Sequence, residues 1–186
     1  MTFVLLGILN AQAAGVAAGD FELLETQTLG TATSSVTFTG LDSYTDYKHL
    51  QIRMITEATS GSGENLLLTF NSDTGTNYAR HQLFGNGSSV VSGADTSTTG
   101  IWTALPSSVN FVSSVTDILD FSSTSKNTTV RTLTSGIFGG SNDDYILLRS
   151  GVYINTNAIT SLTLTAISSN IATGSRFSLY GIKAGA

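Results

Sequence analysis

The feature that most constrains the fold of this chain is the alternation of apolar and polar residues in short stretches from residue 20 onward. In KHLQIRMIT (48–56), the apolar side chains Leu50, Ile52 and Met54 alternate with polar ones. Successive side chains of a β-strand point to opposite faces, so this repeat of two predicts strands with one buried and one wet face. The same repeat occurs in SSVTFTG (34–40), ENLLLTF (64–70) and SLTLTA (161–166).

The chain also closes on such a stretch. In SRFSLYGIKA (175–184), Phe177 and Leu179 fall in step, and the stretch ends almost at the last residue. We therefore expect a final strand that belongs to a sheet.

Turn signals separate these stretches. Glycine and asparagine tolerate the positive φ of tight turns, and they cluster in residues 71–77, 85–89 and 139–144. No helical repeat is evident after residue 19, and the sole proline, Pro106, is expected in a loop or at a strand edge. About nine to eleven short strands predict an all-β fold, an antiparallel two-sheet β-sandwich of jelly-roll type spanning residues 20–186.

Residues 1–19, MTFVLLGILNAQAAGVAAG, differ from the rest because they carry no charged side chain. A signal peptide would begin with a positive charge, but the first basic residue is Lys48. A membrane-spanning helix needs about 20 mostly apolar residues, whereas Asn10, Gln12 and three glycines interrupt this segment. The third interpretation, which we favour, is an assembly arm that a partner molecule buries. Its apolar contacts would be Phe3, Val4, Leu5, Leu6, Ile8 and Leu9.

Composition excludes several classes of function. Charged residues make up only 11% of the chain, the net charge is −5, and the eight Lys and Arg residues do not cluster. A nucleic-acid backbone requires a concentrated basic patch, so we expect no nucleic-acid partner. The chain has no cysteine, which rules out disulfides and thiolate metal sites.

The sequence shows no recognisable catalytic or metal-binding pattern, so we expect a protein that is not an enzyme and has no cofactor or metal. His49 and His81 are expected to be strand-surface or hydrogen-bonding groups, because a catalytic base needs a positioned partner. Asp117 and Asp120 have an odd spacing that sends them to opposite faces of a strand. NSDTGTN (71–77) lacks the spacing and the closing glutamate of a calcium loop, which favours a solvated turn.

Aromatic residues offer another route to function, because an exposed ring can stack on a sugar. The candidates for contacts with a glycan are Tyr44, Tyr47, Trp102 and Tyr153. The competing interpretation, which we consider stronger, is that they are core or edge residues with a hydrogen-bonded tip.

Several stretches together resemble a β-rich module of tailed-bacteriophage virion proteins, found in tail-fibre, head-decoration and other structural proteins. They are FELLETQTL (21–29), SSVTFTGL (34–41), YTDYKHLQIR (44–53), FNSDTGTNY (70–78), GNGSS (85–89), DILDFSSTSKNTTVR (117–131), SGVYINTNAITSLTL (150–164) and SRFSLYGIK (175–183). The resemblance covers residues 21–183 in order, and its specificity lies in the number of stretches.

The resemblance implies a non-enzymatic structural component of the virion surface with a β-sandwich fold, working as an oligomer. Only a short segment precedes the module here, in place of the long shaft of a tail fibre. We therefore expect a capsid-decorating or head-spike protein that contacts other virion proteins through residues 1–19, and we expect a homotrimer. The alternative is a tail-fibre or tail-tip module that recognises a host-surface glycan.

Overall fold

The computed structural model of the chain describes residues 20–61, 63–137 and 144–183. Residues 1–19, and with them the six apolar residues of the expected arm, lie outside the described residues. The described part is all-β, with twelve strands and one short 3₁₀ turn, η1 (Leu41–Ser43). The upper limit of the nine to eleven strands expected is one short of this number, because the two-residue β7 is too brief to show a repeat.

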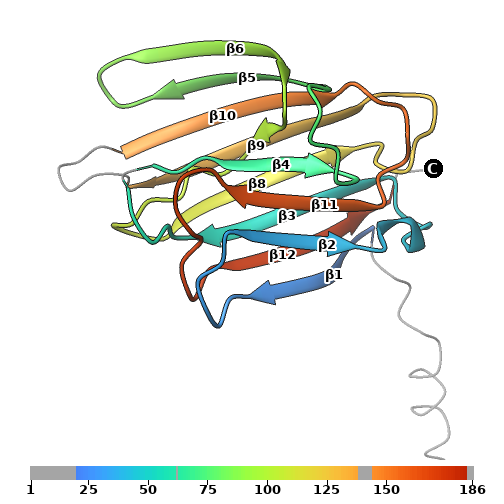
Figure 1. Cartoon of the computed structure of the whole chain (residues 1–186), viewed down its shortest axis with the longest axis horizontal. Coiled ribbons are helices and arrows are strands. Elements are labelled where there is room, and N and C mark those ends of the chain that lie inside the picture. Colours follow the sequence, from blue (N-terminus) through green and yellow to red (C-terminus); the bar gives the residue numbers. More distant parts are fainter. Residues whose placement is uncertain (1–19, 62, 138–143, 184–186) are drawn as a thin grey trace, which may run out of the picture.

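The strands form two antiparallel sheets (Figure 1). In spatial order, the eight-stranded sheet contains β1 (Phe21–Thr28), β12 (Arg176–Ile182), β3 (His49–Thr56), β8 (Val112–Leu119), β9 (Thr128–Ile137), β10 (Asp144–Tyr153), β5 (Tyr78–Gly85) and β6 (Val90–Thr98). The four-stranded sheet contains β2 (Ser35–Thr39), β11 (Ser161–Ala166), β4 (Leu66–Phe70) and β7 (Ile101–Trp102). The predicted two-sheet sandwich is thereby confirmed.

The pairing confirms the jelly-roll type. Eight of the strands pair from the outside inward, β1 with β12, β2 with β11, β3 with β8 and β4 with β7. Two further pairings, β12 with β3 and β11 with β4, wrap this long hairpin into two facing sheets. Such wrapping of one antiparallel hairpin into two sheets is the defining arrangement of a jelly roll.

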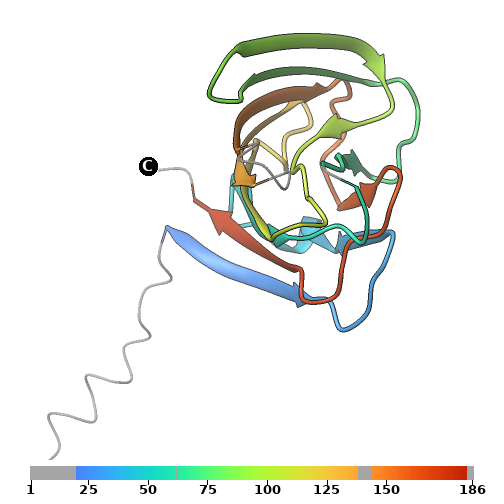
Figure 2. The same ribbon diagram turned by 90° about the vertical axis from the view of Figure 1, so that its left-hand side faces the viewer.

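The remaining four strands enlarge only one of the two sheets. β5 and β6 are inserted between β4 and β7, while β9 and β10 are inserted between β8 and β11. All four add to the free side of β8, in the order β9, β10, β5 and β6. Figure 2 shows the result end-on, with the β5–β6 hairpin at one extreme of the larger sheet and β1 at the other.

The alternation in the sequence matches the observed faces. The expected apolar residues of β3, β4, β2, β11 and β12 are all buried between the two sheets, as predicted. The closing strand β12 lies between β1 and β3, so the expectation that this stretch belongs to a sheet is confirmed. Pro106 lies in the loop after β7. The assignment of residues 1–19 as an arm and 20–186 as one domain stays a prediction.

Candidate binding face on the larger sheet

The outer face of the larger sheet, which points away from the smaller sheet, is the most distinctive surface of the described residues. Strand registers place Leu83, Leu148, Leu133 and Val115 directly opposite one another on the four neighbouring strands β5, β10, β9 and β8. All four side chains are exposed, Leu133 by 53%. Ile146, on the next row of the same face, is 65% exposed. We call the first four residues the apolar row.

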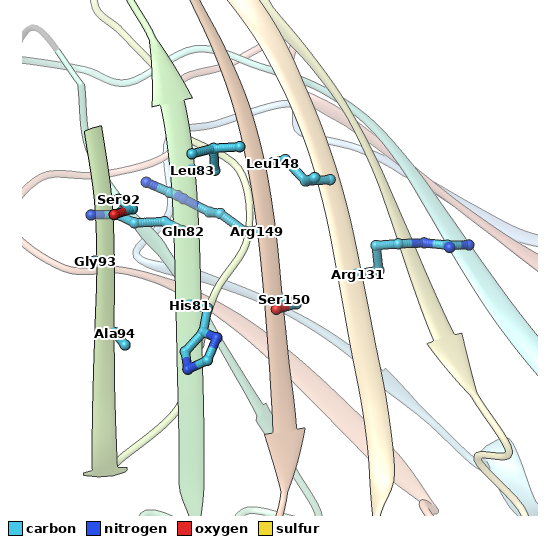
Figure 3. Close-up of a pocket in the computed structure, with 10 residues that line it drawn as sticks. All are labelled: His81, Gln82, Leu83, Ser92, Gly93, Ala94, Arg131, Leu148, Arg149 and Ser150. Carbon is cyan, nitrogen blue, oxygen red and sulfur yellow. The ribbon is translucent and has the colours of Figure 1, made fainter. Parts of the chain in front are cut away.

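A concave part of this face has the size of a ligand site. It encloses about 650 Å³ over β6, β5, β10 and β9, and we call it the outer groove. Ligand sites typically enclose about 300–1,000 Å³. In Figure 3, Leu83 and Leu148 lie side by side on neighbouring strands, His81 and Ser150 lie further along the same two strands, and Arg131 projects from β9.

A polar row runs beside the apolar row. His81, Ser150, Arg131 and Asp117 are successive cross-strand partners on β5, β10, β9 and β8. Arg131 donates to Asp117 with an Nη2 to Oδ2 distance of 3.0 Å. Asp117 also accepts a hydrogen bond from Gln51 at 2.8 Å. The groove therefore has an apolar side and a polar side, and its arginine is already neutralised.

An aromatic stack marks the β1 edge of the same face. Phe21 and Tyr180 stack with ring centroids 4.8 Å apart. The guanidinium carbon of Arg53 lies 5.0 Å and 4.9 Å from the two ring centroids. Because β1 begins at Phe21, this stack stands where residues 1–19 join the described fold.

On the inner side of the added strands, a buried arginine attaches β10 to the rest of the sandwich. Arg149 donates from Nη1 to the backbone carbonyl of Thr103 at 2.8 Å and from Nη2 to Oδ1 of Asn65 at 2.8 Å. Among the described residues, no carboxylate forms a salt bridge with it. Burial, helped by the charge of nearby Arg80, lowers the pKa of Arg149 to about 10.

The four glycan candidates do not form one site. Tyr153 and Tyr47 are buried, and both carry hydrogen-bonded tips, to Asp73 at 2.9 Å and to Glu22 at 2.6 Å. Their rings offer no open face to a sugar, and both fit the core interpretation given above. The hydrogen bond to Glu22 is the main cause that raises the pKa of Tyr47 to about 12.

The other two candidates are partly buried. Tyr44 packs against the core. Trp102 lies under the guanidinium of Arg80, whose central carbon is 3.4 Å from the ring centroid. Arg80 in turn pairs with Asp95 at 3.0 Å. One face of the indole is therefore already occupied, and neither residue lines the outer groove.

The two histidines occupy surface and hydrogen-bonding positions, in agreement with the expectation. His49 accepts a hydrogen bond from the backbone amide of Asp120 at 2.9 Å, and His81 is exposed in the outer groove. No group of three or more potential metal-ligating side chains occurs within the described ranges. In the same ranges, no helix has the length and apolarity needed to cross a membrane.

The NSDTGTN segment forms a turn organised by Asp73. Its carboxylate accepts hydrogen bonds from the Gly75 amide at 2.8 Å, the Asn77 side chain at 2.9 Å and the Tyr153 hydroxyl at 2.9 Å. These bonds, that of Asn77 above all, lower the pKa of Asp73. The turn thus uses its carboxylate for internal bonding, which agrees with the interpretation as a turn.

The lowered pKa of Asp73 predicts an acid-sensitive contribution to stability. Its stabilising effect is present above the ordinary aspartate pKa and is lost as the pH falls through the lowered pKa. We expect the free energy of unfolding to fall between about pH 5 and pH 2 more steeply in the wild type than in the Asp73→Asn variant. Urea unfolding at several pH values measures this. Equal slopes in the two proteins would contradict the role of Asp73.

Comparison with known proteins adds little beyond the fold. No family model matches the sequence, and no curated protein matches it. Ruminococcus gnavus IT-sialidase CBM40 bound to alpha2,3 sialyllactose is similar in structure, with a TM-score of 0.39, 8% identity, and 88% of this chain and 95% of that chain covered. A second structure of the same CBM40 has a TM-score of 0.38 and 9% identity, and the match covers 87% of this chain and 94% of that chain. An exo-inulinase from Aspergillus awamori has a TM-score of 0.35 and 15% identity, and the match covers 88% of this chain and 29% of that chain.

Sequence reasoning missed the apolar row, although a signal was present. The run Tyr145–Leu148 in β10 is apolar at four consecutive positions, so it breaks the repeat of two. Leu147 is buried, whereas Ile146 and Leu148 point to the exposed face. A continuous apolar run of this kind is typical of a strand that is buried on both faces.

Proposed function

We propose that this chain is a non-enzymatic structural protein of the tailed-bacteriophage virion surface, a capsid-decorating or head-spike protein that works as a homotrimer. The resemblance of residues 21–183 to phage structural modules supports this proposal. The structural observation that carries it is the apolar row on the outer face, because such a surface serves contact between proteins. Residues 1–19 would join the chain to other virion proteins or to sister subunits.

The clustering of exposed apolar side chains on this face is the physical reason for an assembly role. The four residues of the apolar row and Ile146 are large apolar side chains that are exposed together on β5, β10, β9 and β8. Soluble monomers rarely expose apolar patches larger than a few hundred Å², and larger ones mark interaction sites. The apolar row and Ile146 form one contiguous group of this kind, so we assign this surface to a protein partner.

Deletion of residues 2–19 should prevent incorporation into phage particles while leaving a folded protein. The deleted segment holds six large apolar side chains, whose burial stabilises a contact by roughly 1.5–3 kcal/mol each before the ordering entropy is subtracted. We expect occupancy on purified particles to fall at least about tenfold, measured by mass spectrometry against the major capsid protein.

The control for this experiment is Thr39→Ser, which changes an exposed position on the smaller sheet. Circular dichroism should show the same β-signal for all variants. Normal occupancy of the shortened protein would contradict the role of residues 1–19. Absence of the wild-type chain from particles would contradict the virion assignment itself.

A second candidate function is a tail-fibre or tail-tip module that binds host-surface glycan. The volume of the outer groove and its polar side, with His81 and Ser150 exposed, favour this alternative. A glycan array with the wild type and with His81→Ala tests it. Binding that the substitution weakens would support the glycan function, and no binding to any glycan or host cell would rule it out.

A further inference from the structure

We infer that the apolar row, which borders the apolar side of the outer groove, receives residues 1–19 of a neighbouring copy of this chain. This inference deepens the proposed function. It rests on one part of that proposal, namely that residues 1–19 are an assembly element. It names the surface that this segment binds and the molecule that supplies it.

The two surfaces match in chemistry. Residues 1–19 contain no charged side chain and present six large apolar ones. Across the strands β5, β10, β9 and β8, the apolar row likewise carries only Leu83, Leu148, Leu133 and Val115. Both surfaces are costly to leave in water, and neither requires a charged partner. A single contact between them removes both costs.

The length of the segment is sufficient for this contact. Nineteen residues precede the described fold, and an extended chain of that length spans about 60 Å. The segment joins the fold at β1, and β10 lies five strand positions away in the same sheet. At about 4.8 Å per strand this separation is about 24 Å, so the reach permits contact within one chain and between two chains.

The arrangement of charges favours a neighbouring copy. In the register of the larger sheet, the polar row lies between the row that contains Phe21, where the segment leaves, and the apolar row. To reach its own apolar row, the segment would first have to cross the continuation of this polar row through Tyr180 and Gln51 and pass the guanidinium of Arg53. Covering a charged guanidinium and polar groups with apolar side chains removes their hydration and is unfavourable.

A neighbouring copy avoids this path, because the other end of the apolar row is open. The row ends at Leu83 on β5, next to Ser92 on the edge strand β6. The segment of a second copy can enter over β6 and meet apolar side chains first. A contact in which the segment of each copy binds the groove of the next is heterologous, and such contacts form a ring when the rotation closes. This matches the proposed homotrimer.

Cysteine cross-linking tests the inference cleanly, because the natural chain contains no cysteine. One full-length chain carries a single substitution, Leu5→Cys, Leu6→Cys or Ile8→Cys. A second full-length chain, co-expressed with a larger tag, carries Leu148→Cys. Oxidation should give a disulfide-linked heterodimer that is resolved by size. The matched control replaces Leu148→Cys by Thr39→Cys on the exposed face of the smaller sheet, and we expect at least about tenfold less heterodimer.

Every other cross-linking pattern overturns the inference. A chain that carries both Leu6→Cys and Leu148→Cys would form only an internal link if the segment binds its own subunit. Dominant links between two Leu148→Cys chains would show face-to-face stacking of two copies. Heterodimer yields equal to those of the Thr39→Cys control, at all three positions, would show that the segment does not bind this face.

A charge substitution gives an independent measurement. Leu133→Glu places a carboxylate in the middle of the apolar row at an exposed position, so the fold should persist. We expect it to weaken self-association at least about tenfold in sedimentation equilibrium, and unchanged association would contradict the inference. These measurements need no virus particle, so a chain that cross-links as expected but is missing from particles would overturn the proposed function and leave this inference standing.

Discussion

Replacement of Phe177 by alanine is expected to lower the free energy of unfolding by about 3–5 kcal/mol. Phe177 is fully buried, and it lies on β12, which is hydrogen-bonded to β1 on one side and β3 on the other. Removing the ring leaves a cavity in the core between the two sheets. The fluorescence of the single tryptophan, Trp102, can follow urea unfolding, because this residue lies on β7 of the smaller sheet.

The matched control for Phe177 is Arg176→Ala, one position earlier on the same strand. Arg176 is exposed, so this change should alter the free energy of unfolding by no more than about 0.5 kcal/mol. If both variants lost the same stability, the assignment of the two faces of β12 would be wrong.

Replacement of Tyr153 by alanine is expected to have an effect of similar size, about 3–5 kcal/mol, by analogy with other large aromatic residues. Tyr153 is buried and stacks on Tyr78 with ring centroids 4.8 Å apart. Tyr153→Phe keeps the ring and removes the two hydrogen bonds of the hydroxyl, one donated to Asp73 and one accepted from Asn155, so it should cost about 0.5–1.5 kcal/mol for each bond. Thermal or urea unfolding of the three proteins measures both differences.

This pair of variants also separates the two interpretations of Tyr153. A core residue predicts a large loss of stability in Tyr153→Ala and a small loss in Tyr153→Phe. A residue that served mainly to stack on a sugar would lose binding in the alanine variant without losing stability. A stable Tyr153→Ala protein would therefore contradict the structural role that burial and hydrogen bonding assign to this residue.

The fold was predictable from sequence because the alternation of apolar and polar residues shows which face of each strand is buried. Leu50, Ile52 and Met54 of β3 are buried as their spacing requires. Alternation does not report which strands are neighbours. The insertion of β5–β6 and β9–β10 at the same side of β8 depends on pairings between strands far apart in the chain, and no local pattern contains that information.

The candidate site was less predictable for a related reason. The residue type of Tyr47, Tyr153 or Trp102 suits both a core and a sugar site, and only their three-dimensional surroundings decide between them. The apolar row could not be assembled from sequence because Leu83, Val115, Leu133 and Leu148 come from four strands. They form one surface only through the register of those strands.

The position of β12 has a consequence for the order of events during synthesis. It is the last of the twelve strands to emerge from the ribosome, yet it belongs between β1, the first, and β3. Until it emerges, β1 has no neighbour in its sheet, and the barrier to folding includes the entropy of closing almost the whole chain. A chain that lacks β12 would therefore leave β1 without a strand partner and one edge of β3 unpaired.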